Sequence, residues 1–469
     1  MNKTYGNARI LSIAAFSFSF AYLLSFLFEG QVLYSIINQY GTQTNQYILF
    51  AIISHLVGLF SAGYFIRSQR IAKYTMIGAM AVCVLVTLPF FFKPTVLWLV
   101  GLVIAGYVSG CSVAAWGYFL KIYTPKNQRL KSCADVLIYS NIIMIAINVV
   151  AGNGFPYIGL VLSLLCLVIG AVLIWLLPVD VAQATLKGEE NRAPGKLNRP
   201  MLVLFLFVAV ITVNSGLMYQ VINPAFEHLT GLVSWYWAVP YIVALAFLRN
   251  LPLKAKRPLF LYVGMGMIMT AFLTFMLLGR GSVDYIIVDT LMLGACGIFD
   301  LFWWSIISEM LDYTERPAKV FGIGLSANVF GVLCGGVLGM LMTSVDLPES
   351  EVTVLALIVV CVTLVILPIL NRQLIMLLKN HAYLSAYDHM DEKQQVTIIR
   401  RTKLLDPLTE REQEVLQHIL NGKSNKEIAA ALFVTENTIK THVHNIYSKY
   451  DVGSRAELIS TLLKNQANI

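Results

Sequence analysis

Residues 435–449 place hydrogen-bonding and cationic side chains at helical spacing. At about 100° per residue, Lys440, Thr441 and His444 fall on one side of a helix formed by this stretch. A second side is apolar and holds Ile439, Val443, Ile446 and Tyr450. Such a helix could present its polar side to base edges and phosphates of nucleic acid. It could also be an ordinary helix with one solvated side, so the neighbouring elements have to decide.

The flanking sequence marks the starts and ends of four short helices. Ser/Thr-x-x-Glu, in which hydroxyl and carboxylate satisfy free backbone N–H groups at a helix start, occurs at Thr409–Glu412, Ser424–Glu427 and Ser454–Glu457. Thr435 is a further N-cap candidate. Asn421-Gly422 ends the first helix, because glycine accepts the left-handed backbone that such an end needs.

The second and third of these helices, joined by a turn at Phe433-Val434, form a helix-turn-helix. In that motif the later helix enters the major groove of DNA. Four capped helices in this order therefore favour DNA binding over the ordinary solvated helix.

The C-terminal stretch resembles the LuxR-type DNA-binding domain. The resemblance rests on LTEREQEVL, GKSNKEIA and TENTIKTHVHNIYSK. It implies that Lys440, Thr441 and His444 face the bases. It further implies phosphate contacts from Asn425, Lys426, Thr435, Thr438 and Lys449, and dimerisation through a fourth helix that carries Leu458, Ile459 and Leu462.

Positive charge is not abundant in this module. From Arg401 onward, nine lysines and arginines face eight acidic residues. Because phosphate contacts set the salt-dependent part of DNA affinity, we expect weak binding by a monomer and a homodimer on double-stranded DNA.

The rest of the chain has the composition of a membrane protein. The whole sequence is 57% hydrophobic and 13% charged, with a mean hydropathy of +0.70. A membrane-spanning helix needs about 20 apolar residues. Twelve stretches qualify, at 9–29, 46–66, 71–92, 95–119, 133–152, 155–177, 200–222, 233–249, 258–279, 283–307, 320–344 and 352–374.

Loop charges predict how these spans are oriented. Lysine and arginine gather in the segments on one side, whereas the segments on the other side contain only Lys93 and Arg280. Cytoplasmic loops carry such an excess. We therefore expect a multi-pass protein of the bacterial inner (cytoplasmic) membrane, in contact with the lipid bilayer and with both termini in the cytoplasm.

The spans divide into two sets of six. The longest inner loop separates them, and Tyr123-Thr-Pro before the fifth span is echoed by Tyr313-Thr-Glu-Arg-Pro before the eleventh. This plan resembles the major facilitator superfamily. The loop between the second and third spans, Gly63 to Arg70, lacks the acidic residue usual in that family, which argues against active transport.

Polar residues inside the spans are the candidates for ligand contacts, because they are costly there. Asp289 and Asp300 share one side of the tenth span, and Trp304 follows one turn later. A cationic or aromatic ligand would suit these groups, with Trp116 and Asn214 as further candidates for the cavity. Alternatively, Asp300 is paired structurally and the tryptophans form an interfacial belt. Asp135 is expected to pair with Lys131.

We expect an all-α protein in five parts: a first membrane half (1–178), a middle loop (179–199), a second half (200–379), a linker (380–404) and the LuxR-type domain (405–469). The predicted function is a one-component transcription regulator that senses an unknown small molecule through its transporter-like part. The alternative is a transporter with a regulatory DNA-binding tail. No catalytic constellation, metal-ligand cluster or cofactor motif is present in the sequence, so an enzyme is not expected.

Overall fold

The computed structural model describes residues 2–28, 30–40, 45–125, 128–179, 198–250, 257–311, 314–344 and 408–450, together with parts of 351–369 and 452–462. The predicted linker, 380–404, and residues 180–197 of the predicted middle loop lie outside the described residues. So do Ile459 and the N-cap candidate Ser454. Every regular element in the described part of the chain is a helix.

The chain forms two compact units. One comprises residues 1–186 and 204–369, and the other comprises 187–203 and 370–469. We call the first the membrane unit, and we call residues 408–462 of the second the C-terminal module.

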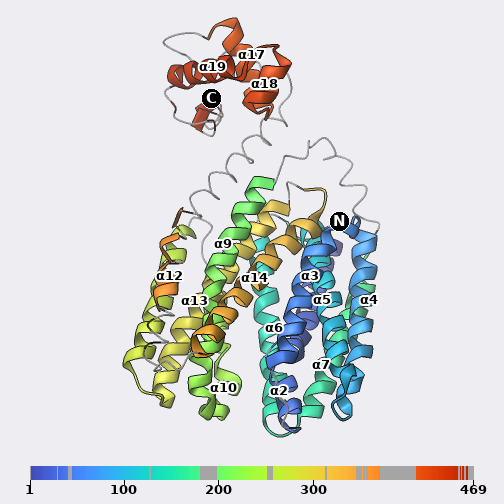
Figure 1. The fold of residues 1–469 in the computed structure, drawn as a ribbon. Coiled ribbons are helices and arrows are strands. Elements are labelled where there is room, and N and C mark those ends of the chain that lie inside the picture. The colour runs from blue at the N-terminus through green and yellow to red at the C-terminus, as the bar shows by residue number, and fades with distance from the viewer. Residues whose placement is uncertain are drawn as a thin grey trace. The chain divides into compact units, whose positions relative to one another are not determined.

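The membrane unit is a bundle of long helices (Figure 1). Its first half contains α1 (Asn2–Tyr22), α2 (Gln31–Asn38), α3 (Asn45–Phe65), α4 (Gln69–Thr87), α5 (Val96–Tyr123), α6 (Arg129–Gly152) and α7 (Pro156–Trp175). The described helices of the second half are α9 (Asn198–Leu217), α10 (Thr230–Tyr236), α11 (Val239–Arg249), α12 (Arg257–Leu277), α13 (Ser282–Met310) and α14 (Pro317–Ser344).

Ten helices in the described residues are long and apolar enough to cross a membrane, and they coincide with ten of the twelve predicted spans. The eighth predicted span, 233–249, is divided into α10 and α11, and Pro240 lies in the first turn of α11. Proline lacks the N–H needed inside a helix, which explains the division. The twelfth span is described only in part, with a short apolar helix at Leu357–Ile366. The count of twelve stays a prediction.

The two halves begin in the same way. α1 ends in a π-helical turn at Leu23–Leu27, and α9 ends in a π-helical turn at Met218–Ile222. Such turns are rare, so their occurrence after the first helix of both halves supports the predicted internal duplication.

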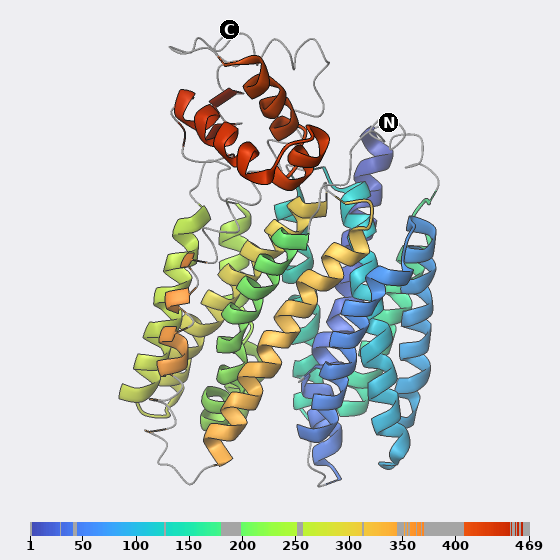
Figure 2. The ribbon, with the colours of Figure 1, turned by 45° about the horizontal axis from the view of Figure 1, so that its top comes forward.

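Glycines bring the helices into backbone contact. Figures 1 and 2 both show α14 beside α3 of the opposite half. A Cβ on Gly322 of α14 would lie 2.3 Å from the carbonyl oxygen of Leu59 on α3. Against α9, a Cβ on Gly335 would lie 2.1 Å from the carbonyl oxygen of Val213. Small residues give membrane helices this close approach, so α14 is packed by backbone on both sides.

The C-terminal module has its own core. Its described helices are α17 (Glu410–Leu420), α18 (Asn425–Ala431) and α19 (Glu436–Lys449). The predicted capping boxes at Thr409–Glu412 and Ser424–Glu427 are both present, and the Thr435 side chain accepts a hydrogen bond from the Thr438 N–H. Gly422 has a φ of 77°, as expected for the end of the first helix. The buried core side chains are Val415, Leu416, Ile419, Leu420, Ile428, Ile439, Val443 and Ile446.

The close contact of α14 with α9 predicts a sharp difference between two adjacent glycines. Gly335→Ala should destabilise the membrane unit by about 1 to 3 kcal/mol, as overpacking of a tight interface does. Gly336→Ala is the matched control, because a Cβ there meets nothing within 4 Å. Thermal unfolding of the full-length protein in detergent measures both, and equal melting temperatures would contradict the packing.

Candidate functional site

The third helix of the module, α19, exposes the side chains expected to face DNA bases. Ile439, Val443 and Ile446 point into the core, so Lys440, Thr441 and His444 are left exposed on the outside. The predicted division of this helix into an apolar side and a polar side is therefore confirmed. These three side chains share a helix face that can donate hydrogen bonds to base edges.

Two of these side chains have partners on their own helix. Lys440 Nζ lies 3.2 Å from Glu436 Oε1, and both side chains are exposed. The Thr441 hydroxyl donates to the Asn437 carbonyl oxygen at 3.1 Å. An exposed ion pair contributes at most about 1 kcal/mol. Lys440 can therefore leave Glu436 for a base or phosphate at little cost.

The residues predicted to contact phosphate divide into two groups. Lys426, Thr435 and Thr438 are exposed, and Asn425 is partly exposed. Thr435 and Thr438 lie at the N-terminus of α19, with their hydroxyl oxygens 2.8 Å apart. The free N–H groups at a helix N-terminus favour anions, so this position suits a phosphate. Lys449 forms the second group.

Lys449 binds within the module. Its Nζ lies 2.8 Å from Glu412 Oε2, and the side chains of Lys449 and Glu412 are only 16% and 5% exposed. Glu412 also accepts the Thr409 N–H in the first capping box. Lys449 thus attaches α19 to the start of α17, and its contact with phosphate stays a prediction.

The Glu412 carboxylate is held in its charged form. Burial by itself would raise the pKa of Glu412, but hydrogen bonds from Lys449 and from Thr409 outweigh burial and lower it. A lowered pKa in the folded state stabilises the fold at neutral pH, and this stabilisation is lost as the pH falls through the lowered value.

The residues predicted to mediate dimerisation are part of the core. Leu458 is fully buried and Leu462 is almost so, both inside the module's hydrophobic cluster. The third, Ile459, lies outside the described residues. The first two side chains are therefore not available on the surface, and the structure gives no support for a dimer contact through them.

Two arginines that the sequence did not single out stabilise the helix-turn-helix. Arg411 donates to the carbonyl oxygen of Leu432 at 2.8 Å, just before the turn at Phe433. Arg455 donates to the carbonyl oxygens of Ile419 and Lys423, where α17 ends. Burial lowers the pKa of Arg455. The spacing of residues in the sequence gives no signal for either contact, since both partners are backbone atoms far along the chain.

The membrane unit places Asp289 and Asp300 on α13, as predicted. Asp300 Oδ2 accepts the Tyr241 hydroxyl at 2.7 Å, and Asp300 Oδ1 accepts the Trp303 indole N–H at 3.2 Å. The neighbour of Asp300 is therefore Trp303, whereas Trp304 had been expected to share this face. Asn214 is buried on α9, where its amide donates to the Ile211 carbonyl oxygen.

Trp304 and Trp116 meet at the boundary between the halves. Their ring centroids are 6.3 Å apart. Phe16 of α1 stacks on Trp116 at 4.3 Å, and Phe321 of α14 packs against both indoles. Trp304 and its neighbour Trp303 are both buried, so the alternative in which these two tryptophans form an interfacial belt is wrong. The two predicted cavity residues come together, but aromatic rings from four helices pack around them.

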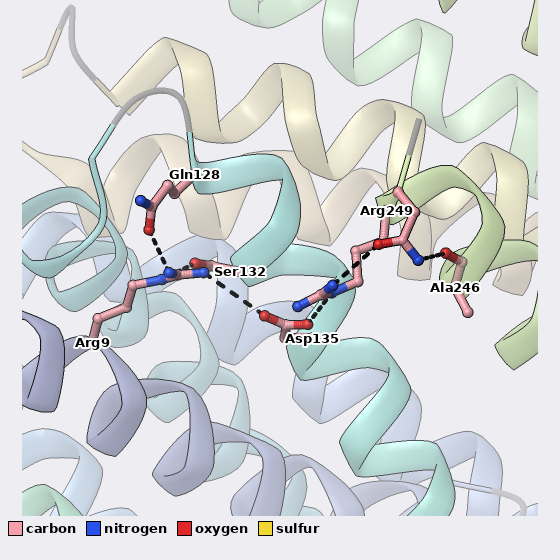
Figure 3. Close-up of polar contacts among 7 residues, drawn as sticks. Arg9, Gln128, Ser132, Asp135, Ala246 and Arg249 are labelled. Carbon is pink, nitrogen blue, oxygen red and sulfur yellow. Dashed lines mark hydrogen bonds and ion pairs between the residues drawn. The ribbon is translucent and has the colours of Figure 1, made fainter. Parts of the chain in front are cut away.

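Asp135 joins three helices and both halves. Its carboxylate accepts a hydrogen bond from Arg249 at the end of α11, and Arg9 of α1 lies 3.8 Å away (Figure 3). Arg9 is itself positioned by Ser132 and Gln128. Asp135 thus pairs with two arginines, where the sequence suggested Lys131. Only the Arg249 contact crosses between the halves.

Two more hydrogen bonds cross at the same ends of these helices. Arg129, at the start of α6, donates to the carbonyl oxygen of Ser308 near the end of α13 at 2.9 Å. Lys121, near the end of α5, donates to the carbonyl oxygen of Thr314 at 2.8 Å. We call the three crossing contacts, from Arg249, Arg129 and Lys121, the polar clamp. It holds the halves together at this end.

Comparison with known proteins agrees with the geometry of the module. Residues 406–462 match the family described as bacterial regulatory proteins, luxR family. The C-terminal domain is of the LuxR type. An uncharacterized transcriptional regulatory protein, YhcZ of Bacillus subtilis, is 52% identical over 61 residues, which are 13% of this chain and 28% of that protein. The response regulator protein VraR of Staphylococcus aureus is 48% identical over 60 residues, 13% of this chain and 29% of VraR.

The chain thus spans less than a third of the curated relatives that it matches. The solved structures instead match the membrane unit. A bacterial homologue of the iron transporter ferroportin, in an outward-facing state with soaked iron, has a TM-score of 0.59 at 14% identity and covers 78% of this chain and 99% of its own. The human organic anion transporter MFSD10 has a TM-score of 0.56 at 13% identity, with the same coverage. The membrane unit therefore shares the fold of these two proteins.

The buried pair predicts a strong effect on the stability of the module. Lys449→Ala leaves the buried Glu412 carboxylate without its cation and should cost about 2 to 3 kcal/mol, somewhat less than for a fully buried pair. The double variant Glu412→Gln/Lys449→Met removes both charges and should recover part of the loss. Urea unfolding of a fragment spanning 380–469 measures each variant at pH 7 and again below pH 4.

Unfolding the same fragments at low pH provides the control for this prediction. The wild-type fragment should lose stability as the pH falls through the lowered pKa of Glu412, because the contribution of the charged carboxylate is present only above it. The double variant should lose less. A single Lys449→Ala variant as stable as wild type at pH 7 would show that the pair does not hold α19.

Proposed function

We propose that the protein is a membrane-embedded one-component transcription regulator. The observation that carries the proposal is the presence, in one chain, of a LuxR-type DNA-binding domain and a membrane unit with a transporter fold. The membrane unit would bind a small molecule, and the module would bind promoter DNA. No second chain is then needed to pass the signal from the membrane to DNA.

On the DNA side, α19 would lie in the major groove of promoter DNA. The exposed Lys440, Thr441 and His444 support this placement, as do Thr435 and Thr438 at the helix N-terminus. Because the module carries little excess positive charge, a homodimer on DNA would supply the affinity. With Leu458 and Leu462 buried in the core, the dimer contact would use other surfaces.

On the membrane side, the termini would lie in the cytoplasm of a bacterial cell with the bundle in its inner membrane. The clamp end of the bundle supports this orientation, because it is the basic end and gathers Arg9, Lys121, Arg129 and Arg249. Cytoplasmic ends of membrane helices carry this excess. The module would then meet the chromosome directly.

Coupling would run through the polar clamp. A ligand can shift two states only by its difference in affinity for them. The halves touch through an ion pair, two hydrogen bonds, close glycine contacts and the aromatic rings around Trp116 and Trp304. The first three contacts, those of the polar clamp, would break when the halves separate at that end. A ligand that favours separated halves would therefore open the clamp end.

A transporter with a regulatory DNA-binding tail is the second candidate. The transporter fold over 78% of the chain favours it. The absence of an acidic residue between Gly63 and Arg70 of the sequence disfavours it. Substrate uptake into vesicles that contain the full-length protein separates the two candidates.

Chromatin capture tests the DNA side. Tagged full-length protein should give discrete promoter peaks in its native host, and Lys440→Ala/His444→Ala should abolish them, since each lost base contact costs about 1 to 3 kcal/mol. Gln417→Ala, an exposed position on α17, is the matched control and should retain the peaks. If the double variant kept its peaks, α19 would not be the helix that reads the DNA.

Promoter output tests the coupling. Arg249→Gln removes the ion pair between the halves, whereas Arg9→Gln removes a contact to the same carboxylate within one half. We expect Arg249→Gln to change basal reporter expression several-fold and Arg9→Gln to leave it near wild type. Similar output from the two variants, at equal protein level, would exclude the clamp as the coupling element.

A further inference from the structure

One side of α13 carries a line of polar groups through the second half. At helical spacing, Tyr285, Asp289, Cys296 and Asp300 fall within about 60° of one another. Tyr285 and Asp289 are 5% and 6% exposed. Cys296 and Asp300 are half-buried. Polar or ionisable groups inside a membrane helix bundle are costly, so the partners of each group matter.

The two carboxylates of this line are not equivalent. Both oxygens of Asp300 accept hydrogen bonds, from Tyr241 and from Trp303. In the described residues, Asp289 Oδ2 is buried with no hydrogen-bond partner, and so is the Tyr285 hydroxyl one turn away. Asp300 is thus held by the protein itself, and Asp289 and Tyr285 are the unsatisfied pair.

The surroundings of this pair are aromatic. The ring of Phe226 lies 5.3 Å from that of Tyr285, and the ring of Tyr236 lies 6.1 Å from it. The nearby Arg280 donates to three backbone carbonyl oxygens at the end of α12 and lies over the Phe275 ring at 4.0 Å. The Arg280 guanidinium therefore already has its partners at the end of α12.

The other titratable groups around Asp289 carry no positive charge. Cys296 and Tyr285 on α13 interact with Asp289, and Tyr236 of α10 interacts with Tyr285. Tyr241 on α11 interacts with Asp300, and Tyr219, in the π-helical turn after α9, interacts with Tyr241. The helices packed against α13 are α5, α6, α11, α12 and α14. Their basic residues all belong to the helix ends at the clamp: Lys121, Arg129, Lys131, Arg249, Arg257 and Lys319. Among the described residues, no basic side chain is therefore placed to neutralise Asp289.

We propose that Asp289 and Tyr285 form a cation-binding site, taken by a proton or by a small organic ammonium ion. A carboxylate buried in an apolar region is stable only when its charge is neutralised. The Tyr285 oxygen adds a hydrogen-bonding group, and the faces of aromatic rings attract ammonium groups. No group of three metal-ligating side chains lies together in the described residues, so the site does not suit a transition metal.

This inference deepens the proposed sensory role, because it names the class of ligand. Asp289 binds the cation and Asp300 fixes the helix through Tyr241. Occupation of the site would join α13 to the aromatic groups of α10, and α13 also carries Ser308 of the polar clamp. The ligand site and the clamp therefore lie on one helix.

The test measures binding without DNA. Full-length protein in lipid nanodiscs is unfolded by heat between pH 5 and pH 9, in sodium chloride or in tetramethylammonium chloride. The variant Asp289→Asn mimics the neutralised carboxyl. Asp284→Asn is the matched control: Asp284 is half-buried in the first turn of the same helix, and an amide oxygen can still accept the Gly281 N–H that its carboxylate accepts.

A proton site predicts that the wild-type melting temperature falls as the pH rises, by at least about 3 °C relative to Asp289→Asn. The sign follows from burial: the folded state favours the neutral carboxyl, so stability is present at low pH and lost at high pH. An ammonium site predicts that tetramethylammonium restores the wild-type value at high pH, and that Asp289→Asn does not respond. Asp284→Asn should follow wild type.

Modification by dicyclohexylcarbodiimide keeps the inference testable if Asp289→Asn does not fold. This apolar reagent adds to protonated buried carboxyls, and mass spectrometry of the wild-type protein locates the adduct. Labelling of Asp289 that declines as the pH rises, or that tetramethylammonium blocks, supports the site.

Parallel melting profiles of wild type and Asp289→Asn overturn the site. If Asp289→Asn does not fold, the proposed site is overturned when neither pH nor tetramethylammonium changes the labelling of Asp289. Chromatin peaks do not bear on this result, so the site and the regulatory role can fail separately.

Discussion

Hydrocarbon supplies no hydrogen-bond partners, and the architecture of the membrane unit follows from this constraint. Each backbone N–H and C=O must be satisfied within its own helix, so the unit is built of long helices that approach through glycine where backbones meet. Most of the charge lies at helix ends, where Asp135 holds Arg9 and Arg249 together. The carboxylates of Asp289 and Asp300 on α13 are exceptions to this distribution of charge. Both oxygens of Asp300 accept hydrogen bonds, whereas Asp289 Oδ2 has no hydrogen-bond partner in the described residues.

The C-terminal module is stabilised by different means. It has a small core, and much of its order comes from helix caps, from two arginines that bind carbonyl oxygens and from the Glu412–Lys449 pair. These contacts fix the angle between α17 and α19, so that the core side of α19 faces inward and Lys440, Thr441 and His444 face outward. Core side chains and exposed polar side chains alternate along this one helix, so any displacement of α19 against α17 would move both sets together.

The local features of both units could be predicted from the sequence. Capping boxes, the glycine at the end of α17 and the two sides of α19 involve residues within one or two turns, where spacing determines contact. Contacts between distant residues could not be predicted. Glu412 and Lys449 are 37 positions apart, and Asp135 and Arg249 are 114 apart, so their pairing depends on tertiary packing. The same reason explains the burial of Leu458 and Leu462.

The aromatic cluster gives the membrane unit an intrinsic optical reporter. Trp116 and Trp304 come from opposite halves and are shielded from water by each other and by the rings of Phe16 and Phe321. Indole emission shifts to longer wavelength when water reaches the ring. Separation of the halves would therefore shift the emission of these two of the seven tryptophans. The conformational state of the membrane unit can thus be followed in an unlabelled protein.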